Sequence, residues 1–173
     1  ARTLWMERHT TANTAGNSLT AQSGGATSGA TDKNSGDLVL APGIAPGTGK
    51  GNVLIQSAIA GTTGTADRAP ATHLKISDGH LTSLGTAPAI SGSCGTSPSI
   101  VGTDVAGKLT TGTVAPTSCT LTFATAWVNA PACVATNETT ANLVRATSTQ
   151  TTVVLAGTFV ASDVLAYICI GRE

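Results

Sequence analysis

The sequence predicts an all-β protein in which a glycine-rich stem of short strands precedes a small β-sandwich or barrel-like head. Threonine, which favours strands, occurs 31 times, while helix formers such as Met, Glu and Lys are scarce. Between residues 16 and 56 short apolar runs alternate with glycine-rich turns, and longer β-branched runs follow only after residue 93. We therefore expect two parts, a stem over residues 1–88 and a head over residues 89–173.

The composition narrows the classes of partner. Leu, Ile, Val and Phe make up about one fifth of the chain, a share at the edge of disordered sequences, but the net charge is zero rather than high. With no net charge and no basic run, the chain lacks the electrostatic basis for binding nucleic acid or an anionic membrane. No apolar run approaches the roughly 18 residues of a membrane helix. We predict neither a nucleic-acid partner nor membrane insertion.

The predicted stem begins with a strand at residues 3–6 and continues with three similar segments. These are Gly16–Ala21, Gly36–Leu40 and Gly51–Gln56, each opening with Gly followed by Asn or Asp, residues that tolerate a tight turn. Strands this short cannot bury themselves within one chain. We therefore expect other copies of the same chain to cover them, giving a homo-oligomeric fibre.

Turn signals lie between and after these segments. Pro42-Gly43 and Pro46-Gly47 predict type II turns, and Asp78-Gly79 predicts a hairpin between strands at residues 73–77 and 80–84. His73, Asp78 and His80 are better explained as turn and strand residues than as metal ligands, and we predict neither a metal site nor a cofactor.

Seven further strands are expected in the head, enough for a sandwich or compact barrel. They cover residues 99–101, 108–114, 118–126, 132–136, 143–146, 151–157 and 164–170. All four cysteines, Cys94, Cys119, Cys133 and Cys169, lie in the head and lack the CxxC spacing of a zinc or redox site. Buried thiols and disulfides both fit them, and four thiols allow three pairings.

Two parts of the sequence form recognisable patterns. One runs through Arg8–Thr20 and Gly24–Leu38; the other includes Cys94–Pro98, Gly102–Lys108, Cys119–Phe123 and Trp127–Cys133. Both resemble segments of tail fibre and tailspike proteins of tailed bacteriophages. The resemblance implies a homotrimer whose chains share a β stem. It also implies a place at the host-contacting end of a virion, after assembly in the host cytoplasm.

Catalysis is not expected. Asp104, Glu138 and Asp163 are isolated carboxylates, whereas sugar hydrolysis uses a pair, and the head has no histidine to activate a nucleophile. The whole chain holds only five aromatic residues for a sugar-binding cleft. A polysaccharide-cleaving tailspike fragment is therefore the weaker alternative to a non-enzymatic fibre tip.

A receptor site on the head should come from its loops. Asn137, Glu138 and Asn142 lie in the most polar loop, with Arg145 just beyond it, and such side chains bind glycan hydroxyls. Trp127 is a further candidate, either as a stacking platform or as a core or interface residue. The predicted partners are other copies of the chain and a host glycan or protein receptor. A purely structural trimerisation or spacer domain with no ligand explains the few aromatics equally well.

Overall fold

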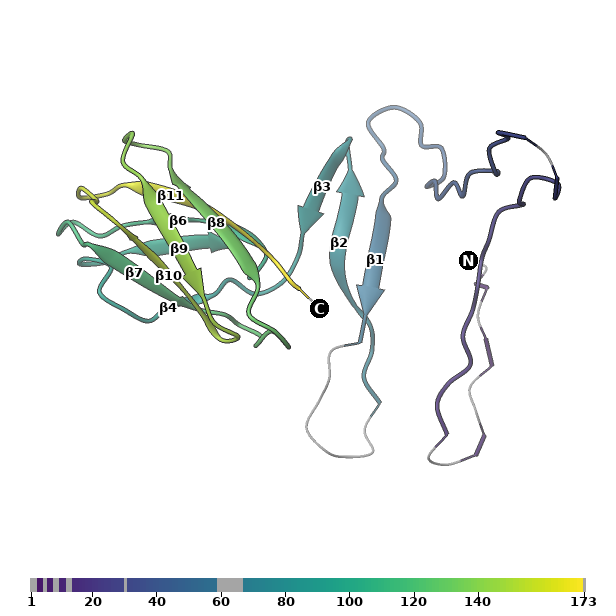
Figure 1. The fold of residues 1–173 in the computed structure, drawn as a ribbon, viewed down its shortest axis with the longest axis horizontal. Helices are drawn as coiled ribbons and strands as arrows, with labels where there is room; N and C mark the ends of the chain where they lie inside the picture. The colour runs from purple at the N-terminus through teal and green to yellow at the C-terminus, as the bar shows by residue number, and fades with distance from the viewer. Residues whose placement is uncertain are drawn as a thin grey trace. The chain divides into compact units, whose positions relative to one another are not determined.

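The structure, a computed structural model, describes residues 3–4, 6–7, 10–11, 14–29, 31–58 and 67–172. Over these residues the chain is all-β, with eleven strands in three antiparallel sheets and no helix (Figure 1). The predicted fold class is confirmed, and none of the sheets formed by these residues closes into a barrel. The chain divides into two compact units, Ala1–Ala41 and Pro42–Glu173, which are described separately.

The described residues of the first unit contain no strand. A turn-rich loop is closed by the Gly36 amide, which donates to the Gly24 carbonyl at 2.9 Å, and by the Ser23 hydroxyl, which donates to the Gly36 carbonyl at 2.5 Å. Leu38 and Val39 are exposed to solvent.

The strands predicted at residues 3–6, Gly16–Ala21 and Gly36–Leu40 are therefore wrong for the single chain, although residue 5 lies outside the described residues. A strand forms only where a neighbouring backbone pairs with its amides and carbonyls. No such neighbour lies along these segments in the described part of the unit.

The second unit begins with a three-stranded sheet of order β1-β2-β3, formed by β1 (Val53–Ser57), β2 (Ala71–Ser77) and β3 (His80–Ser83). Asp78 and Gly79 both have positive φ, 52° and 77°, as a two-residue type I′ hairpin requires. The predicted hairpin is confirmed. The last of the three similar segments becomes β1 because β2 pairs with it.

The turn before β1 differs from the prediction. It spans Pro46–Gly49, closed by the Gly49 amide donating to the Pro46 carbonyl at 3.1 Å. Gly47, with φ of 59°, occupies the second position of this turn, whereas a type II turn would place Pro46 there. No turn forms at Pro42-Gly43. The prediction assigned the wrong position to proline within the turn.

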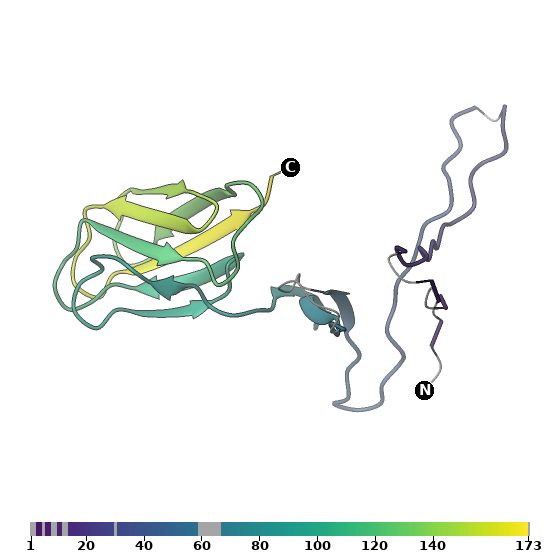
Figure 2. The ribbon, with the colours of Figure 1, turned by 90° about the horizontal axis from the view of Figure 1, so that it is seen from below.

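The remaining strands form a sandwich of two four-stranded sheets (Figure 2). The first sheet has the order β4 (Ala89–Ile90), β7 (Ser118–Thr122), β10 (Thr152–Gly157) and β9 (Val144–Ser148). The second has the order β5 (Ser99–Gly102), β6 (Ala106–Thr110), β11 (Val164–Ile170) and β8 (Ala132–Asn137). The seven predicted head strands are confirmed with altered ends, while the two-residue β4 was not predicted.

The core lies between the two sheets of the sandwich. Alternate residues of the central strands point inward and are fully or almost fully buried, chiefly Leu109, Leu121, Leu155, Leu165 and Tyr167. Burying an aliphatic side chain of this size stabilises the fold by about 1.5–3 kcal/mol. The sandwich therefore has a hydrophobic core of its own.

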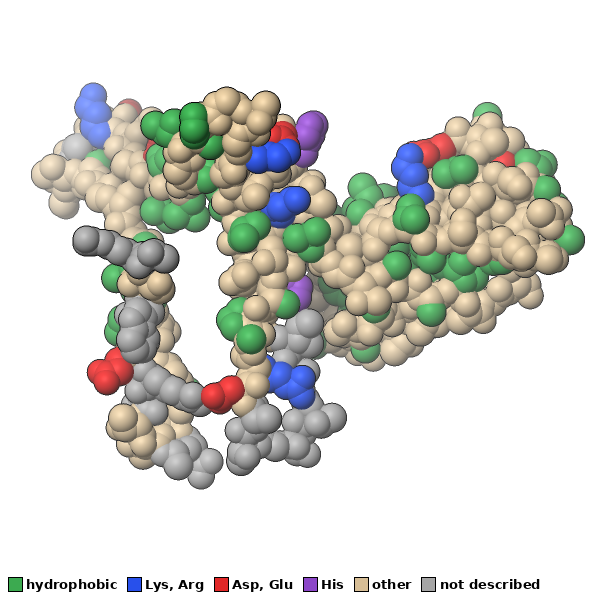
Figure 3. Space-filling model, turned by 180° about the vertical axis from the view of Figure 1, so that it is seen from behind, with side chains coloured by type: hydrophobic (Ala, Val, Ile, Leu, Met, Phe, Trp, Pro, Cys, Tyr) green, Lys and Arg blue, Asp and Glu red, His purple; other side chains and the backbone are tan. Residues whose placement is uncertain are grey.

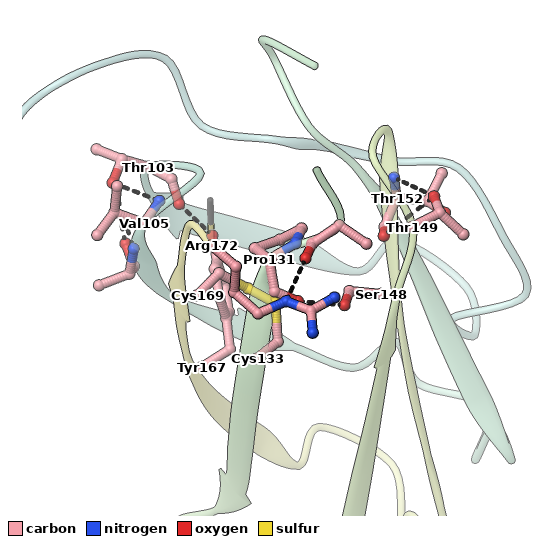
Figure 4. The surroundings of a disulfide bond; sticks show 12 residues. Thr103, Val105, Pro131, Cys133, Ser148, Thr149, Thr152, Tyr167, Cys169 and Arg172 are labelled. Carbon is pink, nitrogen blue, oxygen red and sulfur yellow. Dashed lines mark hydrogen bonds between the residues drawn. A yellow bond between two sulfur atoms is a disulfide. The ribbon is translucent and has the colours of Figure 1, made fainter. Parts of the chain in front are cut away.

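Both disulfides lie in the sandwich and account for all four cysteines. Cys94 bonds to Cys119. Cys133 and Cys169 are direct cross-strand partners of β8 and β11, and their disulfide lies close to Tyr167 and Arg172 (Figure 4). The question of thiols or disulfides, left open by the sequence, is resolved in favour of disulfides.

Candidate functional site

The side chain of Asn137 holds the loop that follows β8. Its Oδ1 accepts hydrogen bonds from the backbone amides of Thr139 at 2.9 Å and Thr140 at 3.1 Å. Its Nδ2 donates to the Thr140 hydroxyl and to the Asp163 carboxylate, both at 2.8 Å. An amide side chain donates two hydrogen bonds and has two acceptor sites, so Asn137 has no donor left for a ligand.

Asp163 joins three loops at this end of the sandwich. It is completely buried, and its Oδ2 accepts hydrogen bonds from Asn137 Nδ2 and from the Val160 amide at 2.9 Å. The Asp163 carbonyl accepts from the Thr111 amide at 2.8 Å. Oδ1 has no hydrogen-bond partner among the described residues. The Asp163 carboxylate therefore joins the β8–β9 and β10–β11 loops, and the backbone carbonyl of the same residue adds the β6–β7 loop.

Glu138 and Asn142 are the more accessible members of the β8–β9 loop. Glu138 pairs with Lys108 at 2.7 Å, and both side chains are exposed enough for the pair to contribute little to stability. Asn142 Nδ2 donates to the Thr158 carbonyl at 2.8 Å. Each keeps polar atoms that can face a ligand.

Arg145 lies on β9, on the outer face of the β4-β7-β10-β9 sheet. The pairing of β9 with β10 places Arg145 and Thr147 outward, while Val144 and Ala146 pack against the core. Arg145 is exposed and makes no hydrogen bond or ion pair with the described residues. Its guanidinium offers five donors in a fixed plane, a geometry suited to carboxylates and sugar hydroxyls.

Trp127 lies at the opposite end of the sandwich. Its ring packs edge-on against Phe123, with 6.0 Å between ring centroids, and its backbone amide donates to the Gln150 carbonyl at 2.8 Å. Its Nε1 is buried and has no partner among the described residues. Trp127 precedes β8 and Asn137 is its last residue, and the six residues of this strand span about 20 Å at strand rise. The structure does not bring Trp127 together with the other four candidates.

A pocket of about 540 Å³ in the second unit was not predicted, because its walls come from segments far apart in the sequence. They include the start of β2, residues 84–86, the β5–β6 turn and Trp127. The lining is mostly apolar. Asp104 lies in the wall, but its carboxylate accepts hydrogen bonds from the Ala124 amide at 2.8 Å and the Thr125 amide at 2.9 Å. This carboxylate holds the β7–β8 loop.

Tyr167 lies beneath the same turn. Its hydroxyl donates to the Thr103 carbonyl at 2.6 Å (Figure 4). Burial raises the pKa of Tyr167 well above its usual value, and the negative charge of Asp104 adds to the effect. The phenol is therefore a structural hydrogen-bond donor that stays protonated at neutral pH.

Other polar groups singled out in the sequence have structural partners. Asp78 pairs with Lys50 at 2.8 Å, and the hydrogen bond between them lowers the pKa of Asp78 and raises that of Lys50. Across the described residues, no three His, Cys, Asp or Glu side chains gather in a way that could hold a metal ion. The part of the chain that the structure describes also contains no helix long and apolar enough to cross a membrane.

Comparisons with protein-family models, with curated proteins and with solved structures found no match to this chain.

Proposed function

We propose that the protein is the tip of a homotrimeric, non-enzymatic fibre of a tailed bacteriophage and that it attaches the virion to the host surface. The observation that carries the proposal is the one-sided character of the β1-β2-β3 sheet. This sheet has an aliphatic face that the described residues cover only in part, and other copies of the chain are the partners we infer.

Strand pairing defines this face. Val53, Ile76 and Leu81 form one row across the sheet, and Ile55, Leu74 and Ser83 form the next row on the same side. The adjacent row, on the other side, is Leu54, Lys75 and Thr82. Leu81 is 68% exposed and Ile55 51% exposed. A three-stranded sheet needs a covering layer on its apolar face to be stable, so a partner is missing from the single chain.

Copies of the chain suit this face because it carries no charged side chain and can pack against itself. Most soluble oligomers are symmetric assemblies of identical chains. The segment Gly36–Leu40 repeats the Gly-Asx-aliphatic pattern that opens β1, and its Leu38 and Leu40 are exposed as well. Repetition of the same uncovered pattern along the chain supports an elongated assembly rather than one local contact.

The disulfides bear on where the protein works. Disulfides persist in oxidising surroundings and are rare in the reducing cytosol. In the proposed life cycle the chains assemble in the host cytoplasm. The two bonds close once the virion has left the cell, where dissolved oxygen takes up the two electrons and two protons released by each pair of thiols. They then stabilise the part of the fibre that meets the next host.

For the attachment surface, the structure favours Arg145, Glu138 and Asn142 over Asn137 and Trp127. Arg145 has all its donors available, whereas the Asn137 amide is fully used within its loop. We propose that the ligand is a host glycan or protein presenting hydroxyl or carboxylate groups to the Arg145 guanidinium.

The assembly is tested by the mass of the intact chain in solution, measured by light scattering. We expect three times the 17.0 kDa chain mass. Leu81→Asp places a charge on the aliphatic face and should abolish the assembly. Thr82→Asp, one residue along β3 on the opposite face, should leave it intact. A monomeric parent chain, or equal behaviour of the two variants, would contradict the proposal.

Attachment is tested by binding of the fluorescently labelled trimer to host cells and glycan arrays. Arg145→Ala should weaken binding at least tenfold without changing the mass, whereas Thr136→Ala, on the other sheet of the sandwich, should not. A trimer that binds no host surface would instead identify the protein as a structural spacer.

A further inference from the structure

The two outer faces of the sandwich differ in chemistry although the same chain builds both. On the β4-β7-β10-β9 sheet most outward positions of the central strands are hydroxyl residues, namely Ser118, Thr120, Thr122 and Thr152. Some of these hydroxyls bond to neighbours on the same face; Thr122, for example, donates to Ser91 at 2.7 Å. This face is suited to water.

The outer face of the β5-β6-β11-β8 sheet is aliphatic over the half nearer the end of β11. Pairing places Ala106, Ile168 and Val134 in one row and Ile170 beside Ala132 in the next. Val134 is 68%, Ile170 65% and Ile168 50% exposed. The other half of the same face carries the ion pair between Lys108 and Glu138. The aliphatic residues are therefore concentrated toward one end of the face, although Val101, 67% exposed, lies in the Lys108 row of the other half.

We propose that this aliphatic patch, defined as Ala106, Ala132, Val134, Ile168 and Ile170, packs against the sandwich of a second copy of the chain. The inference rests on the proposed trimer and adds a second contact between its chains, within the heads. Figure 3 shows one side of the molecule, on which hydrophobic side chains reach the surface of the sandwich with few charged ones among them.

The short connection to the stem sheet indicates a copy of the chain as the occupant. Only residues 84–88 separate β3 from β4, a distance of about 20 Å at full extension. The Ser83 and Thr103 hydroxyls, 2.9 Å apart, shorten this reach further. Thr103 precedes β6, whose first residue, Ala106, belongs to the patch.

Three chains joined through their β1-β2-β3 sheets therefore hold their heads close together. A tether of this length gives an effective concentration on the order of millimolar. At that effective concentration a small aliphatic patch is enough for two heads to associate. The other heads of the same trimer are the partners that the tether keeps at this concentration. The hydroxyl-rich face with Arg145 would then be left outward, available to the host.

The test uses the full chain with a photo-crosslinking residue on either face. Val134→p-benzoylphenylalanine places the probe in the aliphatic patch on edge strand β8. Thr147→p-benzoylphenylalanine is the matched control on edge strand β9 of the other sheet. Both positions are exposed, so neither probe disturbs the core. Light scattering before irradiation gives the number of chains, and a reducing, denaturing gel afterwards gives the covalent products.

We expect a three-chain mass for both variants. A covalent two-chain product should form from the Val134 variant in several-fold higher yield than from the Thr147 variant, and this yield should not change on dilution. A three-chain mass with equal or no crosslinking at the two positions would overturn the head contact while leaving the fibre in place. A single-chain mass would overturn both.

Discussion

Replacing Asn137 by alanine is expected to destabilise the sandwich strongly, because this side chain is structural. The change removes four hydrogen bonds. The bond to the buried Asp163 carboxylate contributes most, about 2 kcal/mol, since a bond to a charged group is stronger and its loss leaves that carboxylate with one donor. The bonds to the Thr139 and Thr140 amides contribute less because water replaces part of them. The expected total is about 3–4 kcal/mol.

Guanidinium chloride unfolding with both disulfides intact measures this loss. A Trp5→Phe background leaves Trp127 as the only tryptophan, and its contact with Phe123 makes its fluorescence a probe of the sandwich. With a slope of roughly 3 kcal/mol per molar denaturant, the midpoint should fall by about 1 M. Asn142→Ala is the matched control, since Asn142 makes one exposed hydrogen bond, and should cost less than about 1 kcal/mol.

The reasoning is refuted if the two variants unfold at the same denaturant concentration. A normal midpoint for Asn137→Ala together with lost binding to host cells would show that Asn137 contacts the receptor instead.

Three further predictions concern the head. Tyr167 is the only tyrosine, and its raised pKa means that the tyrosinate absorbance band should not appear near pH 10 while the chain is folded. The tyrosine of the unfolded chain ionises at a lower pH than that of the folded chain. The contribution of Tyr167 to the free energy of unfolding is therefore complete below about pH 10 and is lost as the pH rises through the folded pKa. The tyrosinate band should then appear together with unfolding. Alkylation of the denatured chain should label no cysteine before reduction and all four after it, and loss of either disulfide should cost about 3–4 kcal/mol. Gly112→Ala should prevent native packing because a Cβ there would lie 2.3 Å from the Thr96 backbone. Gly43→Ala, with open space around the added Cβ, should fold normally. Mass spectrometry checks the alkylation, and circular dichroism and thermal unfolding check the two glycine variants.

The sequence predicted those strands that show a local pattern, either alternating apolar residues or a turn at one end. The alternation in β11 places Leu165, Tyr167 and Cys169 inward, and Asp78-Gly79 allows only a tight hairpin. The pairing of cysteines could not be predicted in the same way. It depends on which strands become neighbours and in what register. Cys133 and Cys169 are 36 positions apart, and the segment between them carries no signal of that register.

The sequence predicted which loop carries the candidate residues, but it did not predict the role of each residue in that loop. Polarity marked Asn137 and Arg145 alike, since both types occur in binding loops. Their roles differ because Asn137 bonds to Asp163, 26 residues further along the chain, whereas the Arg145 side chain makes no hydrogen bond or ion pair with the described residues. A polar residue that ends a strand and precedes Glu-Thr-Thr can equally be a loop anchor, as the hydrogen bonds from Thr139 and Thr140 show.

The β1-β2-β3 sheet and the sandwich lie on either side of residues 84–88 in the sequence, and they differ in how their apolar faces are covered. In the sandwich each sheet covers the other, and two disulfides restrict the unfolded chain, so this fold does not depend on a partner. Among the described residues the β1-β2-β3 sheet has neither a second layer nor a disulfide, and in the proposed assembly association would stabilise its apolar face. This division of labour fits the proposed fibre. In that proposal, the sheet that joins the copies is incomplete alone, and the sandwich that meets the host is complete without them.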